Sequence, residues 1–251
     1  MAEMKAPRGS DSRRRTPARA AHPLLPMLLA APLFEAGSER RPLTPRERQK
    51  LANAATRLQL PAGHVVYREG DPAESVFING GGAIVSYKEL PSGHRRVAGF
   101  RFYADLFGLA EHGAYVNTTR AVTAVTVFRI PAANMVEMLR HDAELHIQFL
   151  CKVVDGLREA QRKSIIVARR DAAGRVAMFI DLLRHIGDRK PLPSRIELPM
   201  TRADIGSYLN LTAESVSRAC RRLSERGILD FDGEGALIVN RRRFEELVAS
   251  L

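Results

Sequence analysis

Four polar residues near the carboxyl end of the chain carry side chains suited to hydrogen bonding with nucleic-acid bases: Glu214, Ser217, Arg218 and Arg221. At about 100° per residue they share one face of a helix, and Val216 points the opposite way. An arginine fork can donate to guanine O6 and N7, and a carboxylate can accept from cytosine N4. A generic solvated helix also carries Arg and Glu on one face, so the pattern alone leaves both interpretations open.

The segment before this helix favours the nucleic-acid interpretation. Residues 201–209 predict a short helix that Thr201 caps, with Asp204 three residues on to complete a capping box. Asn210 then opens a tight turn, because Asn tolerates the left-handed backbone conformation. Two helices joined by such a turn indicate a helix-turn-helix.

The second helix has its own boundary signals and is followed by a hairpin. Thr212 caps it, and Gly227 stops it. Residues 227–231 and 236–239 have the pattern of short strands and flank turn residues at 232–235, which predicts a β-hairpin and makes the motif winged. We assign base reading to Glu214, Ser217 and Arg218. We assign backbone or supporting contacts to Thr201, Arg202, Thr212, Ser215, Arg221 and Arg222.

The composition agrees with a polyanionic partner. The 251 residues carry a net charge of +11, which favours nucleic acid or an anionic membrane surface. No run approaches the roughly 20 apolar residues of a membrane span. Residues 24–34 look like a signal-peptide core, but prolines interrupt the run, so we do not expect secretion. Only two cysteines are present, which excludes a disulfide scaffold and favours a reducing, cytoplasmic location.

The rest of the chain divides into three parts. We expect residues 1–42 to form an unstructured basic tail, which is either solvated or acts as a non-specific DNA-binding arm. Residues 43–136 start with a short helix at Pro45, with Leu51 and Leu58 on its apolar stripe, and continue as short strands between Gly-rich turns. We expect residues 171–251 to form the winged helix-turn-helix DNA-binding domain.

Residues 137–170 predict one long helix that links the two domains. Its seam alternates in steps of three and four, as in a coiled coil. A second copy of the chain would supply the partner helix and give a two-fold dimer. Packing on its own domain is the alternative. The seam residues are Ile147, Leu150, Val154, Leu157, Gln161 and Ser164.

Together these motifs resemble the CRP/FNR family of bacterial transcription regulators. The resemblance implies an α+β fold with an N-terminal antiparallel β-roll sensor domain, a jelly roll of the cyclic-nucleotide-binding kind. A long dimerisation helix and a C-terminal winged helix-turn-helix follow. The matching stretches, within residues 43–248, are 67–72, 99–100, 104–108, 200–206 and 211–218.

The Glu-x-x-Ser-Arg pattern of Glu214, Ser217 and Arg218 resembles the FNR and FixK branch, which reads TTGAT-N4-ATCAA-type palindromes. The resemblance therefore implies a homodimeric regulator, mainly an activator. It would recruit RNA polymerase to genes of low-oxygen or nitrogen-oxide-linked respiration. The FNR cluster needs four thiolates, which two cysteines cannot supply, so the FixK-like subgroup fits better.

Other effectors fit the sequence less well. Tyr115 and Val116 stand where the family's cyclic-AMP binders carry an Arg-Ser pair, so nothing obvious neutralises a buried phosphate. A haem-dependent nitric-oxide sensor of the same family is the alternative, although none of the seven histidines stands in a haem-attachment motif. We therefore expect no cofactor.

Two other classes of protein compete with a regulator. A β-roll enzyme such as a cupin would need clustered ligands, and the histidines are scattered, so we expect no enzyme. A membrane-surface protein would use the basic tail. Cys220 lies inside the second helix and is either a small core residue or a redox thiol activated by Arg221 and Arg222.

Overall fold

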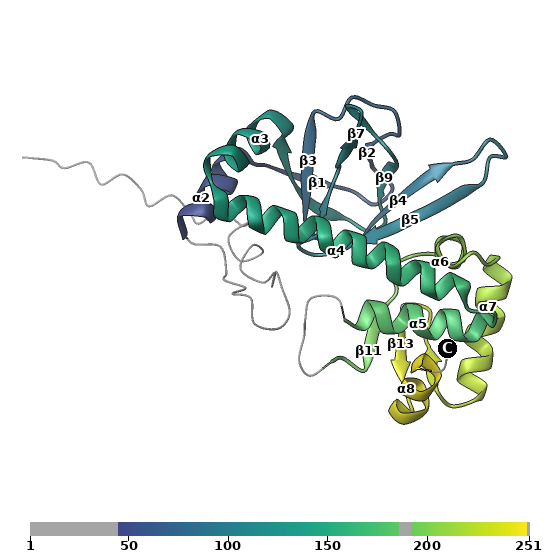
Figure 1. The fold of residues 1–251 in the computed structure, drawn as a ribbon. Coiled ribbons are helices and arrows are strands. Elements are labelled where there is room, and N and C mark those ends of the chain that lie inside the picture. The colour runs from purple at the N-terminus through teal and green to yellow at the C-terminus, as the bar shows by residue number, and fades with distance from the viewer. Residues whose placement is uncertain (1–44, 186–191, 250–251) are drawn as a thin grey trace, which may run out of the picture.

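The computed structural model describes residues 45–185 and 192–249. An N-terminal domain of antiparallel strands is joined by a long helix to a C-terminal helical domain with a small sheet (Figure 1). This is the α+β architecture predicted from the sequence. The basic tail lies outside the described residues.

The described part opens with helix α2 (Pro45–Ala54), which buries Leu51. Strand β1 (Thr56–Leu60) begins two residues later and pairs antiparallel with β10 (Val125–Pro131). Leu58, expected on the helix, therefore lies in a strand. Strand β10 lies far from β1 in the sequence, so the local spacing of apolar residues does not predict their pairing.

The strands form two four-stranded sheets, in the orders β1-β10-β3-β6 and β2-β9-β4-β5, and β7 pairs with β8. Neighbouring strands are far apart in the chain except for β4 and β5, which form a hairpin. The remaining bounds are β2 (Val65–Tyr67), β3 (Ser75–Gly81), β4 (Ile84–Glu89), β5 (Arg95–Arg101), β6 (Leu106–Phe107), β7 (Ala110–Glu111), β8 (Ala114–Tyr115) and β9 (Thr118–Ala121).

Aromatic side chains fill the interior of this β domain. The rings of Tyr67 and Tyr115 are stacked with centroids 3.8 Å apart. Phe77 and Phe107 stack beside them at 5.3 Å from each other. All four residues belong to one buried cluster. Large aromatic rings therefore occupy the core of the domain.

Two helices occupy the segment where one helix was expected from residue 137 to 170. Helix α3 (Ala132–His141) ends at Asp142, and helix α4 (Ala143–Ala168) begins immediately after it. The Asp142 backbone is extended, and its carboxylate accepts a hydrogen bond from the Leu145 amide at 3.1 Å and also pairs with Lys50 at 2.7 Å. Asp142 thus caps a new helix, which is the usual effect of Asp at this position.

Helix α4 packs against its own chain along one face and leaves its other face open. Leu145, Cys151 and Ile166 are buried. Along the predicted seam, Leu150 is 51% and Leu157 59% exposed. The other seam residues, Ile147, Val154, Gln161 and Ser164, are also exposed. Nothing within the described chain covers this face.

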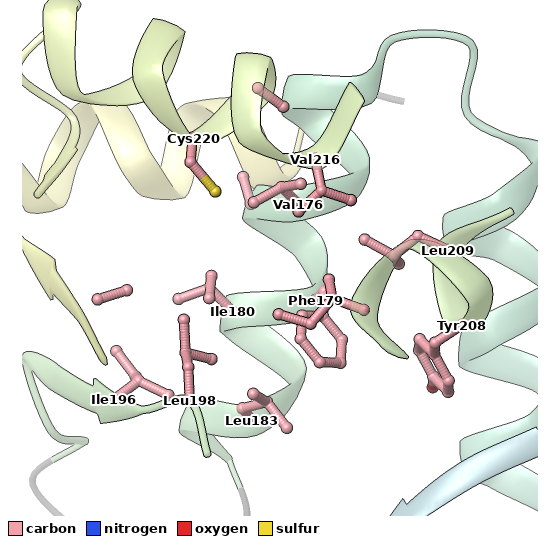
Figure 2. Packing of buried hydrophobic residues seen from close by; sticks show 14 of the residues in the cluster. Val176, Phe179, Ile180, Leu183, Ile196, Leu198, Tyr208, Leu209, Val216 and Cys220 are labelled. Carbon is pink, nitrogen blue, oxygen red and sulfur yellow. The ribbon is translucent and has the colours of Figure 1, made fainter. Parts of the chain in front are cut away.

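The C-terminal domain is built from four helices and a three-stranded sheet in the order β11-β13-β12. Its buried cluster joins residues of α5, α6 and α7 (Figure 2). Neither β11 nor α8 was predicted from the sequence. The bounds are α5 (Ala172–Arg184), β11 (Arg195–Glu197), α6 (Arg202–Leu209), α7 (Ala213–Glu225), β12 (Leu229–Phe231), β13 (Gly235–Ile238) and α8 (Arg241–Ala249).

Candidate nucleic-acid interface

Helix α7 has one buried face and one exposed polar face. Val216, Ala219, Cys220 and Leu223 are buried. On the opposite side the side chain of Glu214 is 84% and that of Arg218 69% exposed. The other exposed polar residues of the helix are Ser217, Arg221, Arg222 and, at its end, Glu225. Long donors and a carboxylate therefore stand together on the open side of a helix anchored in the core.

The turn between α6 and α7 holds the two helices at close range. Asn210 adopts the left-handed conformation with φ 57°, and its amide bonds to the Gly206 carbonyl. A Cβ at Gly206 would lie 2.7 Å from the Leu211 carbonyl oxygen, so a larger residue would push the turn away. Gly206 was not predicted to have a role, although a glycine inside a predicted helix is itself a signal of close packing.

Both helices of the motif carry the predicted N-caps. The Thr201 hydroxyl accepts from the Asp204 amide at 3.0 Å, and the Asp204 carboxylate closes the capping box. The Thr212 hydroxyl accepts from the Ser215 amide at 3.1 Å. These caps fix the helix starts, and the positive end of each helix dipole favours an anion such as phosphate.

Consecutive hydrogen bonds link Thr212, the N-cap of α7, to the long side chain of Arg218. Thr212 donates from its hydroxyl to the Ser215 hydroxyl at 3.0 Å. Arg218 donates from its guanidinium to the same Ser215 oxygen at 3.1 Å and lies 3.6 Å from the Glu214 carboxylate. Arg218 is thus held toward the amino end of the helix while remaining largely exposed.

The wing sheet contacts the first helix of the motif through an aromatic ring. The Arg202 guanidinium lies 5.4 Å from the ring centroid of Phe231 on β12. This cation–π distance indicates that the wing orients Arg202 at the start of α6. An Arg195–Asp232 ion pair ties β11 to the turn of the β12–β13 hairpin. Arg202 was predicted as a supporting residue, but its contact with Phe231 was not, because Phe231 lies in a different element.

Cys220 faces the core. Its side chain is 5% exposed, and Figure 2 shows it pointing from α7 toward the apolar cluster. Burial raises the pKa of the Cys220 thiol, although Arg202 partly offsets the effect. This is opposite to the lowered pKa expected from Arg221 and Arg222, so the argument for an activated thiolate loses its support.

The β domain offers no recognisable phosphate cradle at the position the family resemblance indicates. Tyr115 is 6% exposed, and its hydroxyl donates to the Ser75 carbonyl at 2.7 Å. Its ring stacks on Tyr67 inside the domain. A neutral tyrosine whose hydroxyl already donates to a backbone carbonyl cannot neutralise a buried phosphate, so these residues do not fit a cyclic nucleotide.

Comparison with known proteins decides the family. Residues 57–142 match the model of the cyclic nucleotide-binding domain, and residues 174–247 match that of the Crp-like helix-turn-helix domain. The chain is 30% identical over 168 residues to the nitrogen fixation regulation protein FixK of Rhizobium meliloti, covering 66% of this chain and 74% of the relative. The chain belongs to the CRP/FNR family of transcription regulators.

The chain is also similar to a solved structure and to a second curated relative of this family. The structure of FixK2 from Bradyrhizobium japonicum superposes with a TM-score of 0.71 at 31% identity, covering 78% of this chain and 98% of that chain. The transcriptional activator protein FnrA of Stutzerimonas stutzeri is 28% identical over 184 residues, 72% of this chain and 75% of the relative.

Membership of the CRP/FNR family makes the protein a DNA-binding transcription regulator and not an enzyme, as the sequence predicted. DNA is the partner that the helix-turn-helix domain implies, and proteins of this family dimerise. None of the helices within the described residues has the length and apolarity to cross a membrane.

Proposed function

We propose that this CRP/FNR regulator is a cytoplasmic homodimer that reads a two-fold palindrome of the TTGAT-N4-ATCAA type. The main observation that supports the proposal is the exposed polar face of α7. Glu214 and Arg218 stand there beside the capped helix start, and Ser215 holds Arg218. In this proposal Glu214, Ser217 and Arg218 read base edges in the major groove.

The supporting residues surround this reading face. Thr201 and Thr212 cap the two helices of the motif, so their amino ends are available to DNA phosphates. Arg202, Ser215, Arg221 and Arg222 supply further donors near the helix starts and along α7. Half or more of the hydrogen bonds in a protein–DNA complex go to the backbone, so these residues would set register and not sequence preference.

The open face of α4 supports the dimer. An exposed stripe containing Leu150 and Leu157 on a 26-residue helix needs an apolar partner. The same stripe on a second copy is self-complementary about a two-fold axis. Two α7 helices would then enter successive major grooves about 34 Å apart.

The proposed physiological role follows the FNR and FixK branch. The chain carries the recognition pattern of that branch, and relatives named FixK and FnrA match most of its length. We propose activation of genes for low-oxygen or nitrogen-oxide-linked respiration, through recruitment of RNA polymerase. Because Tyr115 stands where the family resemblance places a phosphate-binding arginine, the protein would bind its site without cyclic AMP. Two cysteines are too few for an iron–sulfur cluster, so we propose binding without that cofactor as well.

Footprinting of the purified protein on genomic fragments tests this proposal. We expect protected sites that share a two-fold TTGAT-N4-ATCAA-like sequence, without added nucleotide and equally with and without air. Arg218→Ala should need a higher protein concentration to give the footprint, whereas Glu246→Ala, on the exposed surface of α8, should give it at the wild-type concentration. Protection without a shared palindrome would contradict the proposal.

A further inference from the structure

Strand β5 is the edge of its sheet. In the order β2-β9-β4-β5 it pairs only with β4, by antiparallel bonds that run from Arg101 to Arg95. The other side of an edge strand presents backbone N–H and C=O groups without a strand partner, and such groups must be paired or solvated. In this protein, groups of β5 have partners from outside the β domain.

The first partner is Ser207 of α6, the first helix of the helix-turn-helix. Its hydroxyl donates to the Arg95 carbonyl at 2.6 Å and accepts from the Val97 amide at 2.8 Å. One side chain thus satisfies both the carbonyl and the amide that a neighbouring strand would otherwise pair. One residue along, the Arg96 guanidinium donates to the Asn210 side chain at 3.1 Å, in the turn between α6 and α7.

The second partner is Lys163, near the end of α4. Its ammonium donates to the Val97 carbonyl at 2.6 Å and to the Ala98 carbonyl at 3.2 Å. The same ammonium lies 4.5 Å from the ring centroid of Tyr208 on α6. Lys163 therefore contacts the sensor domain and the DNA-binding domain from the helix that links them.

Apolar packing continues across the same boundary. The rings of Phe100, Phe179 and Tyr208, from β5, α5 and α6, lie with centroids 5.3 to 6.0 Å apart. Val97 and Phe100 belong to the same buried cluster as the core of the helix-turn-helix domain. The edge of the β domain and the DNA-binding domain thus share one core, and β5 lies beside α6 in Figure 1.

We propose that β5 is a dock that holds the helix-turn-helix in its DNA-binding orientation, with Ser207 and Lys163 as the positioning residues. In a dimer joined along α4, the angle of α7 to α4 fixes the distance between the two recognition helices, and that distance selects the half-site spacing. The sensor domain therefore acts as a fixed brace for DNA binding. This inference rests on the proposed palindrome binding.

Half-site spacing is the property to measure. Full-length wild type, Ser207→Ala and Lys163→Met are titrated against the palindrome with a four-base-pair spacer and against one with a six-base-pair spacer. Each substitution should reduce the ratio of the two affinities by about five- to tenfold, the loss expected from one charged or doubly used hydrogen bond. A residue that only stabilised the fold would lower both affinities together and leave the ratio unchanged.

Two matched variants serve as controls. Ser92→Ala removes a hydroxyl from the tip of the β4–β5 hairpin, where it contacts His94 at 3.2 Å. Lys88→Met removes an ammonium that pairs with Glu69 at 3.0 Å within the β domain. Both should keep the wild-type spacing ratio. An unchanged ratio in Ser207→Ala and Lys163→Met, or tighter DNA binding by either, would overturn the dock.

Amide hydrogen exchange tests the dock in the wild-type chain, so the result does not depend on how a variant folds. The Val97 amide, which donates to Ser207, should exchange slowly in free protein and stay protected on the palindrome. Rapid exchange in free protein would contradict the dock even if no palindrome were bound. Loss of protection on DNA would show that the hairpin restrains binding. Failure to bind any palindrome, with Val97 protected, would instead count against the proposed function.

Discussion

The Arg218 guanidinium donates a hydrogen bond to the Ser215 hydroxyl at 3.1 Å, one helical turn nearer the start of α7. Ser215 in turn accepts from the Thr212 hydroxyl that caps the helix. A long side chain loses up to about 2 kcal/mol of rotamer entropy when it is fixed. Holding Arg218 in this network before DNA arrives reduces the entropy lost on binding, so the cap and the reading residue act together.

Arg218→Ala should weaken binding to the palindrome by about 1–3 kcal/mol and relax base choice at one symmetric position. The reason is that a bidentate contact to one base is lost from each half-site. Binding measured against all single-base variants of the site checks both effects. Full affinity with unchanged base preference would show that the assigned face of α7 does not meet the groove.

Ser215→Ala should have a smaller effect of the same kind. It removes the hydroxyl that orients Arg218 but leaves the guanidinium in place, so a loss of about 0.5–1.5 kcal/mol is expected. In the Arg218→Ala background the further loss should shrink toward zero, because the two residues are coupled. Fully additive losses in this double-mutant cycle would contradict the coupling.

Leu157→Glu should dissociate the dimer. Leu157 is 59% exposed on the open face of α4, and a two-fold axis near it would bring two new carboxylates together in an apolar seam. Sedimentation equilibrium measures the result. Arg140→Glu, on the neighbouring helix α3, is the control and should leave the dimer intact. A Leu157→Glu protein that stays dimeric would show that the seam is misassigned.

The local elements were predictable from the sequence because their signals are local. Thr201, Asn210 and Thr212 stand at helix ends, where one side chain or one backbone conformation decides the boundary. The polar and buried faces of α7 follow from helical periodicity alone. Asp142, which ends α3 and caps α4, carries the same kind of signal, but the apolar seam through this region hid it.

Contacts between remote segments were not predictable in this way. Strand β1 exists because it pairs with β10, some 70 residues away. The Ser207 hydroxyl meets β5 across a separation of 110 residues from Val97, and no residue pattern within α6 marks that contact. Tertiary pairing also places Cys220 in the core, whereas charge along the helix alone suggested an activated thiol.

Cys220 should behave as a structural residue. Burial raises the pKa of its thiol, so at neutral pH the unreactive protonated form dominates. Cys220→Ser should lower the free energy of unfolding by about 1–3 kcal/mol, because it places a hydroxyl in an apolar site. Wild type and Cys220→Ser should lose DNA binding at equal rates in peroxide, followed by gel shift. Rapid loss that Cys220→Ser abolishes would establish the redox role instead.

Cyclic AMP should not change DNA affinity. Tyr115 fills the position that the family resemblance gives to a phosphate-binding arginine, and its ring stacks 3.8 Å from Tyr67. Calorimetry of the protein with cyclic AMP should detect no heat of binding. Tighter DNA binding in the presence of the nucleotide would mean that Tyr115 moves out of the core.

The most direct test of sequence reading by α7 compares two DNA duplexes in one fluorescence-anisotropy titration of the unmodified protein without additives. One carries the TTGAT-N4-ATCAA palindrome, and the other carries the same bases in scrambled order at the same salt concentration. We expect the palindrome to bind at least about a thousandfold more tightly, at a stoichiometry of two chains per duplex. Equal affinity for the two duplexes would contradict sequence reading by α7.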